Sequence, residues 1–252
     1  MNNSIFQFGE SRPEFGVRVL NERAVRASAG LLFFFAMAAF MNAFLLGNFQ
    51  PTRVFVVAFL LDFTLRIFVN PRFAPSLILG QWVVRKQQAE YVGAPQKRFA
   101  WAIGFVLALA MLYLVVLNNV IGPINMLVCS TCLILLFCET AFGICIGCKL
   151  YNAFHKEQAQ LCPGGACELP PDQRPTTSVV QWAIVALFVL TVAALAQWVY
   201  STTPLRQVQI PQATSAAPAA PSDPAEVERC KVPEFAKALG HEQMWKLHSN
   251  CK

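Results

Sequence analysis

The chain has 252 residues, of which 56% are hydrophobic and only 13% are charged, and its formal net charge is +6. An ordinary soluble domain carries about 25% charged residues, so half of the usual charge is missing. Three windows contain no Asp, Glu, Lys or Arg, and each is longer than the roughly 20 apolar residues that one membrane-spanning helix needs: 27–52, 99–138 and 175–205. This composition excludes a soluble enzyme, a disordered chain and a small disulfide-rich secreted protein. It predicts an all-α, polytopic transmembrane helical bundle.

Apolar runs in the sequence predict five membrane spans. The window 99–138 is too long for one helix, and it breaks near Gly122-Pro123, since proline opens a helix but does not continue one. A fifth apolar run ends in Trp198 and Tyr200, residue types that favour the membrane–water interface. The expected spans are 27–46, 54–69, 101–117, 124–146 and 179–200.

The distribution of Lys and Arg predicts the orientation of the bundle. Basic residues are concentrated before the first span, in the loop 71–98 and after the fourth span, whereas the short loops on the other side hold only Arg53. Because positively charged loops stay on the cytoplasmic side, we expect a cytoplasmic N-terminus and a periplasmic tail in a bacterial inner membrane. The first partner is then the lipid bilayer, and no nucleic acid is expected.

The remaining organisation follows from local composition. In the loop 71–98, the apolar triplets 77–79 and 82–84 precede Arg85-Lys86, a pattern typical of a membrane-surface helix, with a solvated connector as the alternative. The expected segments are a cytoplasmic N-terminal segment at 1–26, a four-span core ending in a Cys-x-x-Cys at 27–155, a cysteine-containing loop at 156–178, the fifth span at 179–200, a Pro- and Ala-rich linker at 201–224 and a short external helix at 225–252.

Cys145 and Cys148 form a Cys-x-x-Cys that we expect on one face of a helix, at the cytoplasmic end of the fourth span. In a reducing compartment such a pair indicates redox or metal chemistry more often than a structural disulfide. With Cys162 and Cys167 the spacing becomes C-x2-C-x13-C-x4-C, which approximates a four-thiolate zinc site or the ligands of an iron–sulfur centre. Unreactive reduced cysteines are the remaining alternative.

Two further cysteines, Cys230 and Cys251, flank the expected external helix. Disulfides persist in a periplasm, and a bridge here would stabilise a segment that is too small to have a core of its own. We therefore expect a structural disulfide. An intermolecular bridge and a redox-active external pair are the alternatives.

Three charged residues are expected inside the bilayer, where an ionisable side chain is by default a candidate for function. Asp62 and Arg66 are four residues apart in the second span and can neutralise each other. Glu139 has no such neighbour in its own helix, so we expect it to pair with Arg66 or to be protonated. Its role is then either that of a proton carrier or ion ligand, or that of a packed hydrogen-bonding group.

Three motifs resemble a bacterial integral membrane family catalogued as a domain of unknown function, DUF4395. They are Asn-Pro-Arg-Phe-Ala-Pro at 70–75, Gly-Ala-Pro-Gln-Lys-Arg-Phe-Ala at 93–100 and Ala-Phe-Gly-Ile-Cys-Ile-Gly-Cys-Lys-Leu-Tyr at 141–151. The resemblance covers about residues 15–155. It implies a four-helix membrane core that ends in a Cys-x-x-Cys, and it supplies no activity.

The leading functional hypothesis is an accessory thiol-redox or sulfur-transfer protein that uses Cys145 and Cys148, with a thioredoxin-like protein as a partner. A transporter of small solutes or ions that uses Asp62 and Glu139 is the second. A structural subunit of a larger membrane complex is the third. The sequence has no Ser/His/Asp set, nucleotide-binding glycine loop or zinc-protease motif, so an enzyme is not favoured.

Overall fold

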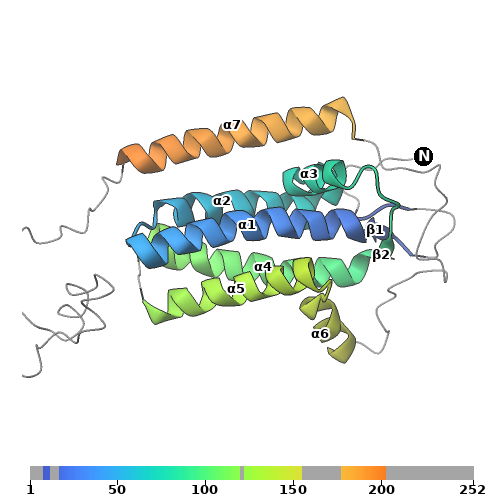
Figure 1. The fold of residues 1–252 in the computed structure, drawn as a ribbon, viewed down its shortest axis with the longest axis horizontal. Helices are drawn as coiled ribbons and strands as arrows, with labels where there is room; N and C mark the ends of the chain where they lie inside the picture. The colour runs from blue at the N-terminus through green and yellow to red at the C-terminus, as the bar shows by residue number, and fades with distance from the viewer. Residues whose placement is uncertain (1–7, 12–16, 120–121, 155–176, 203–252) are drawn as a thin grey trace, which may run out of the picture. The chain divides into compact units, whose positions relative to one another are not determined.

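Four helices that run up and down beside one another form the core of the computed structural model, which describes residues 8–11, 17–119, 122–154 and 177–202 (Figure 1). They are α1 (Glu22–Leu46), α2 (Gln50–Thr64), α4 (Ala94–Met111) and α5 (Pro123–Ala141). Buried Val, Leu, Phe, Ala and Met side chains fill the space between them. The predicted all-α bundle is therefore confirmed.

Local sequence signals explain where these helices begin and end. The Asn21 side chain caps α1 by accepting hydrogen bonds from the backbone N–H groups of Arg23 and Ala24, at 3.2 and 3.4 Å. The same helix ends at Gly47, whose φ of 63° is the left-handed conformation common after a helix C-terminus. Helices α2, α4 and α5 each carry proline in the first turn, where no backbone N–H is needed.

Four helices are long and apolar enough to cross a membrane: α1, α4 with its extension, α5 and α7 (Val179–Thr202). Our predicted second span, 54–69, is made instead of the 15-residue α2 and a π-helical turn, η1 (Leu65–Val69). Helix α4 likewise continues into a π-helical turn, η3 (Leu112–Leu117). Single π-turns inside longer helices are often associated with functional or packing constraints.

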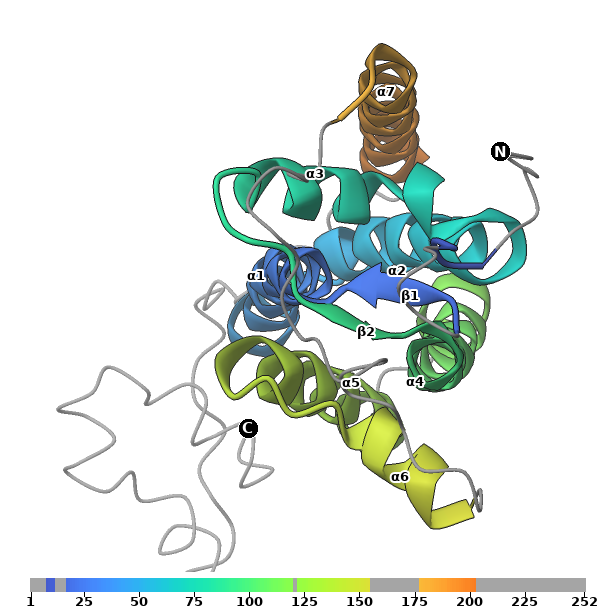
Figure 2. The ribbon, with the colours of Figure 1, turned by 90° about the vertical axis from the view of Figure 1, so that its right-hand side faces the viewer.

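The loop between the second and third predicted spans is folded onto the bundle. It contains the 3-10 turn η2 (Pro71–Phe73), helix α3 (Pro75–Val83) and strand β2 (Tyr91–Gly93), and β2 pairs antiparallel with β1 (Val19–Asn21). Figure 2 shows α3 lying crosswise over the ends of the bundle helices. The expected helix in this loop is present, whereas the three-residue strands have no alternating pattern and were not predicted.

Helix α3 lies against α1 at Gly80. A Cβ atom at this position would stand 2.4 Å from the Ala24 carbonyl oxygen and 2.8 Å from the Ser28 backbone nitrogen, so only glycine fits. Since the obstacle is backbone rather than a flexible side chain, the two helices must separate if a side chain is added.

We expect Gly80→Ala to lower the free energy of unfolding by about 1–3 kcal/mol, the usual range for an overpacked core. Gly122→Ala is the matched control, because a Cβ there meets nothing within 4 Å. Denaturant titration of both variants in lipid bicelles measures the difference. Equal stability of the two variants would show that the α1–α3 contact is looser than the structure has it.

Helix α7 packs beside α2 and α3 at its N-terminal end. The buried Gln181 side chain donates from Nε2 to the Arg72 carbonyl oxygen at 3.0 Å, and the Trp82 and Trp182 rings meet edge to face at 6.0 Å. Most other large side chains of α7 are exposed, as expected of a helix that faces lipid on most sides. The predicted loop 156–178, apart from its last two residues, lies outside the described residues, as do the linker and external helix beyond residue 202.

Candidate functional site

The Cys-x-x-Cys lies at the start of a short helix and not at the end of a span. Helix α5 ends at Ala141, and a separate helix, α6 (Ile146–Phe154), begins after a turn at Gly143, whose φ is 65°. In this turn the backbone N–H groups of Phe142 and Ile144 both donate to the Cys138 carbonyl oxygen. The prediction of one continuous helix over 124–146 was therefore wrong. The chain changes direction here because glycine accepts the left-handed conformation at 143.

Cys145 immediately precedes α6 and Cys148 lies in its first turn. The two sulfurs form a disulfide in the structure, with a Cα–Cα distance of 5.2 Å, which is within the usual range for a bridge. The Cys148 backbone N–H also donates to Cys145 Sγ at 3.2 Å. Cys148 is 5% exposed, whereas Cys145 is partly exposed. Cys145 is therefore the more exposed residue of the pair.

The residues between and after the cysteines hold α6 on α4. A Cβ at Gly147 would stand 2.6 Å from the Ala100 Cβ and 2.7 Å from the Ala100 Cα, so the two helices are in direct contact at this point. One turn later the Tyr151 and Phe99 rings meet at 5.6 Å between centroids. These contacts fix the start of α6, and with it the position of the dithiol.

A cluster of buried charges lies at the same end of the bundle. Lys97 Nζ, on α4, is 2.8 Å from Glu22 Oε2 on α1 and 2.8 Å from Glu139 Oε1 on α5. The expectation that Glu139 would pair with Arg66 was wrong, because its partner is Lys97. Glu139 is also at the C-terminal end of α5 and not in the middle of a span.

Arg26 connects this cluster to the turn before the dithiol. Its guanidinium occupies the space that a side chain would need at Gly143, and its Nε is 3.8 Å from Glu22 Oε1. Arg26 Nε is buried and donates no hydrogen bond to any of the described residues. The Arg26 guanidinium therefore lies beside Gly143, two residues before Cys145 in the sequence. A second basic residue, Lys149, directly follows Cys148.

The second group of buried charges forms a closed network. Arg66 Nε donates to Asp62 Oδ2 at 2.7 Å, and both side chains are almost fully buried. The Arg66 guanidinium also donates to the hydroxyls of Ser28 and Ser76, while the Ser76 backbone N–H donates to Asp62 Oδ1 at 2.9 Å. The Arg66 guanidinium further lies over the Trp101 ring, 5.1 Å from its centroid. The predicted Asp62–Arg66 pair is present, and it joins α1, α2 and the start of α3.

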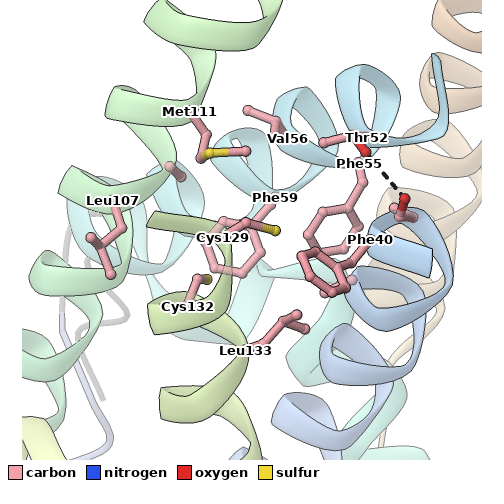
Figure 3. A pocket seen from close by; sticks show the side chains of 13 residues that line it. Phe40, Thr52, Phe55, Val56, Phe59, Leu107, Met111, Cys129, Cys132 and Leu133 are labelled. Atoms are coloured by element: carbon pink, nitrogen blue, oxygen red, sulfur yellow. Dashed lines mark hydrogen bonds between the residues drawn. The ribbon is translucent and has the colours of Figure 1, made fainter. Parts of the chain in front are cut away.

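Cys129 and Cys132 point into a small apolar cavity, about 30 Å³ in volume, between α1, α2, α4 and α5 (Figure 3). Met111, Phe55 and Phe59 are among its other lining residues. A dry, apolar cavity of this size has room for about one water but offers it few hydrogen-bond partners. We interpret these two cysteines as small apolar packing residues, at some distance along α5 from the dithiol.

The metal hypothesis concerns four cysteines of which the structure describes two. Cys162 and Cys167 lie outside the described residues, and so do Cys230 and Cys251 with their expected disulfide. Among the residues that are described, no group of three or more His, Cys, Asp or Glu side chains is arranged to hold a metal ion. Cys145 and Cys148 would supply two of the four ligands of a zinc or iron–sulfur site.

Several residues of the site were not singled out from the sequence. Lys97, Arg26, Ser28 and Ser76 each contact a charged residue or turn of the site, and their partners are far away in sequence. A local signal for the break between α5 and α6 was Gly143, which lies in the turn between the two helices.

Comparison with known proteins gives one match. A family model described as a domain of unknown function (DUF4395) matches residues 20–156. No curated protein and no solved structure matches the chain.

Proposed function

The chain belongs to the family described as a domain of unknown function (DUF4395), and we propose that it is an accessory membrane protein that carries out thiol–disulfide exchange through Cys145 and Cys148. The observation that carries the proposal is the dithiol at the start of α6, with Cys145 partly exposed and Cys148 buried. The proposal includes a bacterial inner membrane, a cytoplasmic N-terminus and a dithiol on the cytoplasmic side, as the Lys and Arg distribution favours.

The exchange uses two successive displacements. The Cys145 thiolate attacks one sulfur of a partner disulfide, forms a mixed disulfide and releases the partner's first thiolate. The Cys148 thiolate then attacks Cys145 Sγ, closes the intramolecular disulfide and releases the partner's second thiolate. The protein loses two electrons and two protons, and the partner gains both. In the opposite direction a reduced partner, such as a thioredoxin-like protein, restores the dithiol.

The surroundings of Cys145 support this order of attack. A thiolate is favoured at a helix N-terminus and beside cations, and Cys145 precedes α6 close to the guanidinium that lies over Gly143. The earlier expectation placed the cysteines at a helix C-terminus, which disfavours a thiolate. The corrected position therefore strengthens the redox hypothesis.

Asp62 and Glu139 support the transporter hypothesis less well. Each carboxylate is paired with a basic side chain, Arg66 or Lys97, and the Asp62 network joins three segments of the bundle. Such pairing favours a structural role over binding of a solute. A role as a structural subunit of a membrane complex rested on the external tail, which lies outside the described residues.

The Cys148→Ser variant is expected to accumulate a mixed disulfide on Cys145 when native membranes are treated with oxidised glutathione or oxidised thioredoxin. The reason is that the second displacement is lost. The Cys145→Ser variant leaves only the buried Cys148 and should react far more slowly. Alkylation followed by peptide mass spectrometry measures both products, and Cys129 and Cys132 in the same sample serve as controls for nonspecific reaction.

Two results would contradict the proposal. One is a lack of mixed disulfide in the Cys148→Ser variant under all redox conditions. The other is protection of Cys145 and Cys148 from alkylation that only a strong chelator removes, which would favour the metal site with Cys162 and Cys167.

A further inference from the structure

Helix α6 is a short amphipathic helix with an exposed apolar stripe. Ile146, Leu150 and Phe154 are four residues apart, so at 100° per residue they fall within roughly 80° of one face. Leu150 is 42% exposed and Phe154 is 74% exposed. Ile146 is 37% exposed, so the stripe is partly covered at the start of the helix and most exposed at its end, whereas Gly147 and Cys148 on the same helix are buried.

The other faces of α6 have different surroundings. Gly147 and Tyr151 face α4, as the contacts with Ala100 and Phe99 require, and Cys148 is buried. Lys149 and Asn152 lie on the side away from this contact and are exposed. The helix therefore has a protein-facing side, an apolar exposed side and a polar exposed side. This division is typical of a helix that lies at the boundary between lipid and water.

The position of α6 fits that boundary. It directly follows a helix that is apolar and long enough to span a membrane, and both views show it running across the bundle axis at one end of the bundle (Figures 1 and 2). Exposed apolar rings also occur near the end of α5, on Phe137, and directly after it, on Phe142; they are 43% and 63% exposed and in contact with each other. Ile144, in the turn between the two helices, is 39% exposed, so exposed apolar side chains occur at the end of the spanning helix, in the turn and on α6.

We propose that α6 is an interfacial membrane helix, which inserts Ile146, Leu150 and Phe154 among the acyl chains of the bilayer while Lys149 reaches toward the headgroups. An ammonium group on a long apolar stem is suited to this position, and anionic headgroups complement its charge. The disulfide on the bundle side of α6 is then held at the level of the headgroups. A reactant must reach Cys145 at the membrane surface. This inference concerns the placement of α6 and stands independently of any redox activity.

The test is a measurement of immersion depth on the full chain in nanodiscs of phosphatidylethanolamine and phosphatidylglycerol. A nitroxide label is attached through a keto amino acid at 150, 154, 149 or 152, one position at a time, so that the native cysteines are unchanged. Leu190, 68% exposed in α7, provides a lipid-facing reference position. Power-saturation electron paramagnetic resonance compares collisions with oxygen, which concentrates in lipid, and with a nickel chelate, which stays in water.

The oxygen-to-nickel collision ratio is expected to be several-fold higher at 150 and 154 than at 149 and 152, and to approach the value at 190. Nickel-dominated collisions at all four positions would overturn the proposal, because α6 would then lie in water. Protection of 150 and 154 from both reagents would overturn it as well, because another segment or a second copy of the chain would cover the stripe.

Discussion

Replacing Arg66 with alanine is expected to lower the free energy of unfolding by about 3–5 kcal/mol, the range found when one partner of a buried ion pair is removed. Asp62 and Arg66 are each 1% exposed, so the remaining carboxylate is left without a counter-ion in an apolar environment. The variant also removes the guanidinium donors to Ser28 and Ser76. Because these residues lie on α1 and at the start of α3, the loss should loosen both.

Denaturant titration in bicelles, followed by circular dichroism, measures the change. Arg85→Ala is the matched control, since Arg85 is exposed and contacts only its neighbour Trp82 in the described contacts, and removal of an exposed cation costs about 0–1 kcal/mol. The double variant Asp62→Asn/Arg66→Met should recover part of the loss, because no unpaired charge is buried. Equal destabilisation by Arg66→Ala and Arg85→Ala would show that the network contributes little.

The membrane bundle could be predicted because its signals are local in sequence. Long uncharged windows define the spans, and Pro51, Pro95 and Pro123 occur in the first turns of their helices. The Asp62–Arg66 pair could also be predicted, because four residues along a helix bring two side chains onto one face. Each of these inferences needs only helix geometry and composition.

The site could be predicted only in part, because its contacts join distant segments. Lys97 and Glu139 are 42 residues apart, and a single sequence gives no signal that pairs them. The break between α5 and α6 was missed because the apolar run continues to Ile146, and hydropathy does not distinguish one helix from two separated by a turn. Glycine is needed at 143 because Arg26 lies against it, and at 147 because Ala100 lies against it. Both contacts join distant parts of the sequence and are visible only in the folded chain.

The Lys97→Met variant is expected to show the second large loss of stability, again about 3–5 kcal/mol, for a different physical reason. Lys97 is the cation between two carboxylates from different helices, and its side chain is 1% exposed. Removing it leaves Glu22 and Glu139 close together with less compensation, so like-charge repulsion adds to the cost of burying them. The three helices α1, α4 and α5 should then separate at this end of the bundle.

The same variant connects the charge cluster to the dithiol. Glu139 lies two residues before the end of α5, which leads into the turn toward α6. Ala100, the contact of Gly147, is one turn after Lys97 on α4. We therefore expect Cys148, buried in the native protein, to be alkylated faster after reduction in Lys97→Met than in Lys86→Met, a control variant at an exposed lysine away from the dithiol. The triple variant Glu22→Gln/Lys97→Met/Glu139→Gln should restore slow alkylation, because it removes the repulsion together with the cation. Fast alkylation in the triple variant would instead assign the effect to the lost packing of the Lys97 side chain, and an unchanged rate in Lys97→Met would show that the charge cluster and the dithiol are held independently.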